Sequence, residues 1–518
     1  MESAISTRQE PGSTRLAARE AANGMVARMR RQRLGRRPAL AAIALAVLCV
    51  GALVGYFAFP TYPTYDSFYA LLWGRDLLHL HLPDFRVYRG PTEHPLAIFF
   101  GTFCSIFGDG GARLMVLGSI ASFVAAVSGL YRLGRLCYGP VVGLLAALLL
   151  LSRFFVENLA TQGYLDISYV ALIVWAVVLE VERSKRGELV LFMLALAGLL
   201  RPDAWVLSGA YWLWCYPRSD TRTRVRRLAL AASAPVIWVA LDTIVTGNPV
   251  YSLTATAGLA QELERAHGLS HVIESVWTFS ERIDKLPVML GALAGIPLAV
   301  WMAPRRTLVP LATAVLLYLV FVAEGAVGAS VIDRYLLGGA TMLLLFCAVT
   351  LGGWWMLTPG SWLRRVWITG AAALTVFGAA SAATTLNLTT LRNTLAYHEE
   401  FHKGLASALR DPAVKAKLEH CKLLSLPNNK LIPDARWVLD TYGQHDIVAR
   451  SQARANVGKG SHALEQRLLK GSVAVYPLSS AIFYVAIVDV GDDPRDQVPL
   501  RGFSPIFANR YYAVYANC

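Results

Sequence analysis

The sequence predicts an all-α, polytopic membrane domain followed by a small mixed α/β domain that is soluble and lies outside the membrane. Of 518 residues, 55% are hydrophobic and only 16% are charged, which is not the composition of a soluble globular protein. Long apolar runs recur between residues 39 and 387, and roughly 20 apolar residues suffice for one crossing. After residue 390, charged and turn-forming residues return together with short β-like runs.

We expect about eleven transmembrane helices from the length and spacing of the apolar runs. The expected spans are 39–59, 113–131, 139–156, 165–181, 188–200, 202–217, 228–247, 287–303, 308–327, 334–356 and 366–387. The run at 188–200 is short, so we expect it to be tilted or broken near Arg201-Pro202.

Basic residues predict the orientation of these spans. Arginines cluster just before residue 39, and every second loop afterwards carries paired basic residues, as at Arg305-Arg306 and Arg364-Arg365. This alternation places the N-terminus in the cytoplasm and the C-terminal domain outside. The formal net charge of +14 is spread over these clusters, which indicates contact with membrane lipids and excludes a nucleic-acid-binding patch.

Three segments follow from this topology. Residues 1–38 form a basic cytoplasmic tail that we expect to be disordered, and residues 39–389 form the membrane domain, with outer loops at 60–112 and 248–286. Residues 390–518 form the outer domain, in which 396–420 has helical spacing. The β-like runs of that domain are 473–476, 482–490 and 511–515.

Cysteine usage fits the same division. Cys421 and Cys518 are the two cysteines of the polar C-terminal part, and the other five lie in or near apolar runs without CxxC spacing. Outside the cytoplasm the two could form a disulfide. The sequence does not give their separation, so paired and unpaired states both remain open.

Ionisable residues gather at the expected outer ends of the helices. Asp66 follows the first span in a loop, Asp166 opens the fourth span, and Arg201 and Asp203 flank the junction of the fifth and sixth. Asp333-Arg334-Tyr335 opens the tenth span. Because ionisable groups are costly at membrane depth, their concentration on one face indicates a function.

The residue types indicate one reaction class. A carboxylate can take the proton of an acceptor hydroxyl as it attacks an activated sugar carbon. An arginine can hold a phosphate with paired hydrogen bonds and stabilise its growing charge. A second acid can orient the acceptor or bind a divalent cation such as Mg²⁺ or Mn²⁺, although no ligand cluster with metal-site spacing is present in the sequence.

Each residue also has an ordinary interpretation. Asp166 can be an N-cap, and Asp333-Arg334 can be a local salt bridge. Arg201-Pro202-Asp203 can be a kinked junction with satisfied charges, while His94 before Pro95 can be structural, and Asp66 can be a solvated loop acid.

Four stretches resemble the GT-C superfamily of polytopic glycosyltransferases over roughly residues 39–387. Within it, the likeness is to the branch of protein O-mannosyltransferases, the aminoarabinose transferase of lipid A, and actinobacterial arabinofuranosyl- and mannosyltransferases. The stretches are Tyr65-Asp66-Ser67, Gly163-Tyr164-Leu165-Asp166, Leu199 to Trp205 and Asp333 to Leu337.

The resemblance implies transfer of a sugar from a polyprenyl-phosphate donor, with Asp66 as catalytic base. Asp166 resembles the acid of the second loop, and Arg334 with Tyr335 lies where the family binds the lipid phosphate. Arg201, Asp203, Glu93 and His94 are further candidates for substrate binding. Mannosyltransferases carry adjacent Asp-Glu in the first loop, whereas Ser67 follows Asp66 here, which favours a glycan or lipid acceptor over a protein.

Two rival functions use the same residues. A transporter or flippase would place several of the charged groups near mid-helix for substrate coupling. A non-enzymatic scaffold would bind envelope glycans through the outer domain. The Ala- and Arg-rich composition is typical of a high-GC bacterium, so we expect the protein in a bacterial plasma membrane.

Overall fold

The computed structural model describes residues 38–265, 268–385, 388–441, 446–478, 499 and 501–518. The chain divides into two compact units, Met1–Gly51 and Ala52–Cys518. The described part of the first unit lies in the apolar helix α2 (Pro38–Ala58), as the first expected span requires. The second unit holds all the other elements.

A helix is present at each of the other expected spans. The helices of this region are α3 (Tyr65–Leu78), α4 (Pro95–Ser105), α5 (Gly111–Tyr138), α6 (Pro140–Leu151), α7 (Phe154–Thr161), α8 (Leu165–Glu182), α9 (Glu188–Gly198), α10 (Asp203–Cys215), α11 (Thr221–Thr246), α12 (Tyr251–Glu262), α13 (Leu269–Asp284), α14 (Leu286–Met302), α15 (Pro304–Ala326), α16 (Leu337–Gly352) and α17 (Trp362–Thr385). Short 3₁₀ turns are η1 (Gly108–Gly110), η2 (Tyr216–Arg218), η3 (Asp333–Leu336) and η4 (Gly353–Met356).

Not every expected span is long enough to cross a bilayer alone. Six helices in the described part are long and apolar enough, and up to eight if each bent pair is one span. The bent pairs are α6 with α7 at 62° and α13 with α14 at 105°. Helices α9 and α10 have 11 and 13 residues, so the count of about eleven stays a prediction.

The two segments expected to be outer loops are largely helical, and their place outside the membrane stays a prediction. Helices α3 and α4 occupy much of 60–112, and α12 and α13 occupy much of 248–286. Two glycines allow α3 and α4 to touch: a Cβ on Gly74 would lie 2.2 Å from Thr102 N, and one on Gly101 would lie 2.2 Å from Ala70 O. Glycine therefore permits a backbone approach that the apolar pattern did not reveal.

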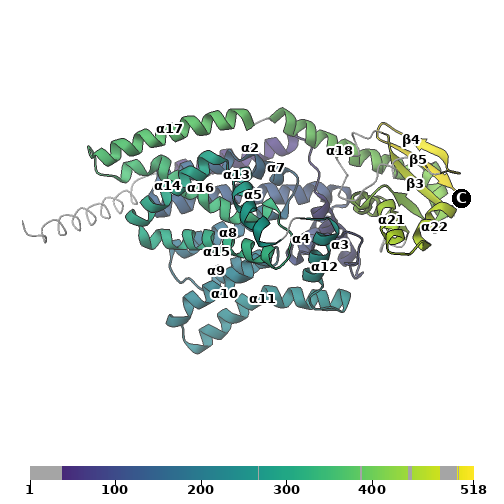
Figure 1. Cartoon of the computed structure of the whole chain (residues 1–518), viewed down its shortest axis with the longest axis horizontal. Helices are drawn as coiled ribbons and strands as arrows, with labels where there is room; N and C mark the ends of the chain where they lie inside the picture. The colour runs from purple at the N-terminus through teal and green to yellow at the C-terminus, as the bar shows by residue number, and fades with distance from the viewer. Residues whose placement is uncertain (1–37, 266–267, 386–387, 442–445, 479–498, 500) are drawn as a thin grey trace, which may run out of the picture. The chain divides into compact units, whose positions relative to one another are not determined.

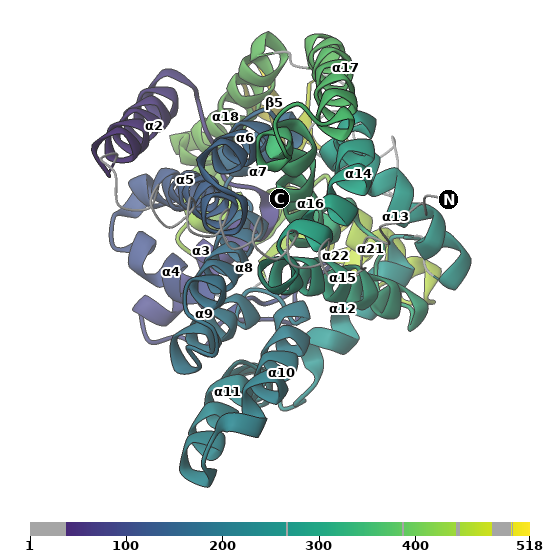
Figure 2. The same cartoon turned by 90° about the vertical axis from the view of Figure 1, so that its left-hand side faces the viewer.

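Helix α16 lies at the centre of the bundle. Nearly all its side chains are buried, and it packs against α6, α8, α14 and α15. Figures 1 and 2 show α8, α15 and α16 side by side, while α9, α10 and α11 form a neighbouring group. The N-terminal ends of α8, α10 and α16 carry the charged residues predicted to form the site.

The C-terminal region contains a five-stranded mixed sheet with the order β2-β1-β3-β5-β4. Strand β1 pairs in parallel with β2 and β3, and β5 pairs antiparallel with β3 and β4. The strands are β1 (Leu424–Leu426), β2 (Ile447–Ala449), β3 (Ser472–Pro477), β4 (Ser504–Ala508) and β5 (Tyr512–Asn517). The predicted runs 473–476 and 511–515 correspond to β3 and β5, whereas 482–490 lies outside the described residues.

Helices cover this sheet. They are α18 (Leu388–Arg410), α19 (Pro412–Cys421), η5 (Asn429–Leu431), α20 (Ile432–Val438), α21 (Arg450–Gly458) and α22 (Ala463–Lys470). The helix expected at 396–420 is present, but it is divided at Asp411, whose carboxylate caps α19 ahead of Pro412.

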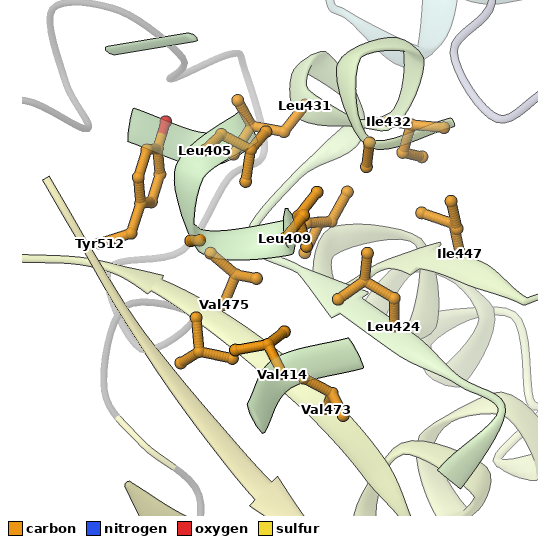
Figure 3. Close-up of a cluster of buried hydrophobic side chains, with 14 of the residues drawn as sticks. Leu405, Leu409, Val414, Leu424, Leu431, Ile432, Ile447, Val473, Val475 and Tyr512 are labelled. Atoms are coloured by element: carbon orange, nitrogen blue, oxygen red, sulfur yellow. The ribbon is translucent and has the colours of Figure 1, made fainter. Parts of the chain in front are cut away.

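The hydrophobic core of this region lies between the sheet and helices α18, α19 and α20. Figure 3 shows Leu405 and Leu409 of α18 facing Leu424 of β1 and Val475 of β3, with Val414 of α19 beside them. All five are fully buried or nearly so. Because α18 begins at Leu388, the expected boundary at 389/390 falls in its first turn, and the division into domains there stays a prediction.

Cys421 and Cys518 form a disulfide that joins the end of α19 to the C-terminus. Their Cα atoms are 5.7 Å apart and 97 residues separate them along the chain. Of the paired and unpaired states that the sequence left open, the structure has the paired one.

Alkylation of free thiols tests the pairing of Cys421 with Cys518. After denaturation without reductant, five cysteines should react with an alkylating agent, and all seven should react after reduction, as mass spectrometry will count. Cys421→Ser should lower the thermal stability of the C-terminal region, because closing so long a loop contributes up to about 4–5 kcal/mol. Cys49→Ser is the control, since Cys49 is free and exposed. Alkylation of seven cysteines without reductant would contradict the pairing.

Candidate active site

Five charged side chains form one continuous chain of alternating sign. Arg334 Nη2 lies 2.8 Å from Asp66 Oδ2, and Arg334 Nη1 lies 3.4 Å from Asp166 Oδ2. The other oxygen of Asp166 lies 2.7 Å from Arg201 Nη1. Arg201 in turn donates from Nε and Nη2 to Asp203 Oδ2, at 3.0 and 2.8 Å. The structure thus joins the acids and arginines that the sequence placed on one face.

Asp66 lies in the first turn of α3, which corrects its expected place in a loop. Thr64 caps the helix by accepting the N–H of Ser67 at 3.4 Å. The hydroxyl of Ser67 donates to Gly163 O at 2.5 Å, and Thr64 N donates to Gln162 O at 2.9 Å. These bonds fasten the start of α3 to the turn before α8.

The turn at Gly163 also positions Asp166, which lies in the first turn of α8. Gly163 has a φ of +73°, a conformation that disfavours a side chain, and α8 begins two residues later. The N-cap of α8 is Tyr164, and Asp166 makes no capping bond. The interpretation of Asp166 as an N-cap is therefore wrong.

Arg334 is presented by η3, directly before the central helix α16. Asp333 does not form a side-chain ion pair with Arg334: its Oδ1 accepts the backbone N–H of Arg334 and its Oδ2 accepts from Arg282, both at 2.8 Å. The interpretation as a local salt bridge is therefore wrong. The guanidinium of Arg334 is left to bridge Asp66 and Asp166.

Aromatic rings support both guanidiniums. Arg201 lies over the ring of Tyr335 at 4.1 Å and over that of Tyr169 at 5.3 Å, and Arg334 lies over Tyr164 at 5.3 Å. Such contacts stabilise a desolvated cation by about 1–2 kcal/mol. The predicted role of Tyr335 in substrate binding is untested, whereas its contact with Arg201 is part of the structure.

Exposure separates two tiers within this chain of charges. The side chains of Asp66 and Arg334 are each 22% exposed, whereas those of Asp166 and Arg201 are 7% and 9% exposed. A substrate can therefore reach the outer pair, while the inner residues hold it in place.

Three comparisons describe what the chain is similar to. The family model for dolichyl-phosphate-mannose-protein mannosyltransferase matches residues 93–245. No curated protein sequence matches significantly. Solved structures of ArnT from Cupriavidus metallidurans, bound to undecaprenyl phosphate, and of the oligosaccharyltransferase AglB from Archaeoglobus fulgidus share the fold.

The likeness covers nearly the whole chain at low identity. For ArnT the TM-score is 0.54 at 12% identity, with 91% of this chain and 98% of that chain covered. For AglB it is 0.51 at 11% identity, with 92% and 74% covered. The resemblance to the GT-C superfamily is confirmed. At these identities it is a likeness of fold.

The electrostatics of Asp66 follow from two opposing causes. Burial raises the pKa of its carboxyl, but the charge and hydrogen bond of Arg334 outweigh burial and hold the pKa below its usual range. Asp66 is therefore ionised whenever Arg334 pairs with it. A carboxylate freed from that guanidinium would be more basic, because burial would then dominate.

His94 and Glu93, adjacent in sequence, lie in different surroundings. Burial lowers the pKa of His94 to about 4, and Asp66, Asp166 and both site arginines are close enough to act on it. Its imidazole is thus neutral at pH 7. Glu93 instead faces Asp242 of α11 and Ser252 of α12, so the structure does not bring it to the Asp66 group.

Two further charged residues near the site, Glu324 and Arg265, were not predicted from the sequence. Glu324, near the end of α15, hydrogen-bonds Asp203, and Arg265 acts on the charge of Asp66. Glu324 interrupts an apolar run, which is a usable signal. Arg265 lies in a polar segment with no such signal.

A divalent cation would have few side-chain ligands among the described residues. They contain no group of three or more His, Cys, Asp or Glu side chains arranged to hold a metal. Asp66 and Asp166, the two acids such an ion would need, are bridged by Arg334. We derive no step through a metal ion.

The C-terminal region touches the helix that carries Asp66. Asn429 Nδ2 donates to the hydroxyl of Tyr65 at 3.2 Å, and that hydroxyl donates to Arg89 O at 3.1 Å. Near the other end of α3, Arg75 donates to Arg436 O at 3.3 Å and to Thr441 O at 3.0 Å. Both ends of α3 are thereby held by η5, α20 and the residues after them.

The buried carboxyl of Glu93 predicts a pH-dependent stability. Its side chain is 4% exposed, its Oε2 has no hydrogen-bond partner in the described structure, and burial raises its pKa to about 8. The folded protein then binds one more proton than the unfolded chain between about pH 4.5 and 8. The free energy of unfolding should fall across this window by on the order of 4 kcal/mol.

Glu93→Gln should abolish that fall, because the amide is neutral throughout. Thermal unfolding in detergent at pH 5 and pH 9 measures it: the variant should be the more stable protein at pH 9. Glu419→Gln, at an exposed site, is the matched control. An equal loss of stability in wild type and Glu93→Gln would refute the assignment.

Proposed function

We propose that the protein is an inverting membrane glycosyltransferase. It transfers a sugar from a polyprenyl-phosphate donor to a hydroxyl of a cell-envelope glycan or lipid, at the extracytoplasmic face. The observation that carries this proposal is the half-buried pair of Asp66 and Arg334, a carboxylate and a guanidinium 2.8 Å apart. The fold supports it, since the ArnT structure that shares it holds undecaprenyl phosphate and the AglB structure holds dolichol-phosphate.

The pair provides a base and a phosphate clamp in one contact. When the donor enters, its phosphate competes for Arg334, which has the fork geometry to hold it. Asp66 then loses the contact that keeps its pKa low, and burial makes it a stronger base. Substrate binding itself thus prepares Asp66 to accept a proton.

The reaction is a single displacement. The acceptor oxygen attacks the anomeric carbon and forms the new C–O bond, while its proton passes to Asp66. The bond between that carbon and the phosphate oxygen breaks, and the polyprenyl phosphate leaves with both electrons, stabilised by Arg334. One displacement inverts the configuration. Asp166 and Arg201 keep Arg334 in place, and we assign them no proton.

An apolar cavity supports a lipid-linked donor. A volume of about 220 Å³ lies between α8, α9, α10 and α15, with Glu180 as its one charged lining residue. Asp166, Asp203 and Glu324 lie at ends of three of these helices. The cavity begins near Ile173, about 10 Å along α8 from Asp166 at 1.5 Å per residue. We assign it to the isoprenoid chain of the donor.

The charged groups do not favour transport. Asp66, Asp166, Asp203 and Arg334 all lie in the first turns of their helices or in the 3₁₀ turn before α16. A coupling site of a transporter would place them near mid-helix.

Replacing the base tests the mechanism. Asp66→Asn keeps the shape but accepts no proton, so sugar transfer by the purified protein from polyprenyl-phosphate sugars should fall by about 10²–10⁴-fold. Asp220→Asn is the control, because Asp220 caps α11 at the surface and asparagine caps equally well. Near-wild-type transfer by Asp66→Asn would remove the base assignment. If wild-type protein consumes none of the lipid-linked sugars, the proposed class is wrong.

Filling the apolar cavity tests the place of the donor chain. Ala312 lines the cavity and is exposed, so Ala312→Trp should fill it without disturbing the core. The KM for a long-chain donor should rise several-fold, while the KM for a donor with two isoprene units stays unchanged. Val376→Trp, at an exposed position of α17 that does not line the cavity, should change neither value. Equal effects on both donors would place the chain elsewhere.

A further inference from the structure

A second cavity lies at the breaks of the two bent helix pairs. Its volume is about 310 Å³. Its lining includes Arg153 from the break between α6 and α7, Arg282 from the last turn of α13, and Lys285 from the break between α13 and α14. Ser381 and Ala382 of α17 close another side. No acidic side chain is among its described lining residues.

Arg153 is fixed in the wall of this cavity. It is 9% exposed, and its Nε, Nη1 and Nη2 donate to Leu149 O, Asp284 O and Ser152 Oγ. One N–H remains on each Nη atom, since a guanidinium has five donors. A desolvated guanidinium is costly unless an anion faces it. Arg153 therefore offers both charge and free donors.

The acids nearest to Arg153, Asp284 and Glu157, form no side-chain hydrogen bond with its guanidinium in the described structure. Asp284 is fully buried, and neither of its carboxylate oxygens has a hydrogen-bond partner in the described structure. Arg153 bonds the backbone carbonyl of Asp284 instead. Glu157 of α7 also acts on Arg153, but no hydrogen bond joins the two side chains in the described structure.

Lys285 adds a second cation held in an unusual backbone conformation. Its φ is +69°, a backbone conformation that is strained for a residue with a side chain. Within the described residues, its ammonium has neither an ion pair nor a hydrogen bond. Arg282 is 55% exposed and pairs with Asp333, so it lies at the open side.

The rest of the lining is mixed: Ser152, Asn158 and Ser381 are polar, and the other four residues are apolar. Phe154, Phe155, Ile283 and Ala382 face the cavity and come from apolar helix pairs and α17. A small soluble anion needs no such walls, whereas a lipid headgroup brings carbon atoms next to its charge.

We propose that this cavity binds the phosphate-bearing headgroup of a membrane lipid. Lys285 and Arg153 contact the phosphate, and Phe154 and Phe155 contact the carbons beside it. Because Arg282 also bonds Asp333, whose other oxygen holds the N–H of Arg334, the bound phosphate competes with Asp333 for Arg282. This site is separate from the Asp66–Arg334 pair and does not depend on the function proposed above.

Binding to full-length protein in phosphatidylcholine nanodiscs tests this site. Phosphatidylglycerol is titrated and its retention measured by native mass spectrometry. Lys285→Gln should weaken binding about fivefold, since one basic residue contributes about 1 kcal/mol near an anionic lipid. Adding Arg282→Gln should weaken it about 25-fold in total. Lys422→Gln is the matched control, because Lys422 also has a positive φ, +58°, but lies in the C-terminal region.

Competition with inorganic phosphate distinguishes a lipid headgroup from a free phosphate ion as the ligand of this cavity. Displacement of phosphatidylglycerol by phosphate at comparable concentration would assign the site to a free phosphate. Lysine-dependent binding of phosphatidylglycerol alone would assign it to the lipid. Equal retention of phosphatidylglycerol by wild type and both Lys285 variants would overturn the proposal, as would equal retention of phosphatidylcholine and phosphatidylglycerol by wild type.

Discussion

The chain of buried and half-buried charges from Asp66 through Arg334, Asp166 and Arg201 to Asp203 is the constraint on which the bundle depends. Each member faces an opposite charge within hydrogen-bond distance or close to it. Removing either arginine would leave carboxylates without their counter-charge, which costs several kcal/mol when they are buried. The starts of α3, α8, α10 and α16 must therefore meet, and the functional pair inherits its geometry from a structural requirement.

The C-terminal region takes part in that geometry. Its core is completed by α18, and its α20 and neighbouring residues hold α3 at both ends through Tyr65 and Arg75. The Asp66 helix is thus positioned from two directions, by the turn before α8 and by the outer region. A domain that looks separate by composition is structurally part of the support of the candidate base.

Much of the fold was predictable because the bilayer imposes a strong pattern. Apolar runs located a helix at each expected span, and β-like runs located β3 and β5. The helical character of 60–112 was not predictable, because α3 and α4 are moderately polar or short and their packing depends on Gly74 and Gly101. The bends at Arg153 and Lys285 were also missed. The expected span 139–156 runs across the first break, and the second lies in a charged stretch assigned to the outer loop 248–286.

The sequence by itself determined which charged residues lie beside the ends of apolar runs, because such a residue is visible in the order of the amino acids. Tertiary structure alone decided their partners. Asp66 lies on a helix and not in a loop. Asp333 pairs with Arg282, which leaves Arg334 to pair with Asp66. Glu93 faces Asp242, whereas its neighbour His94 lies near the site. Pairing is a matter of distances between segments far apart in the chain, and only the packed helices fix those distances.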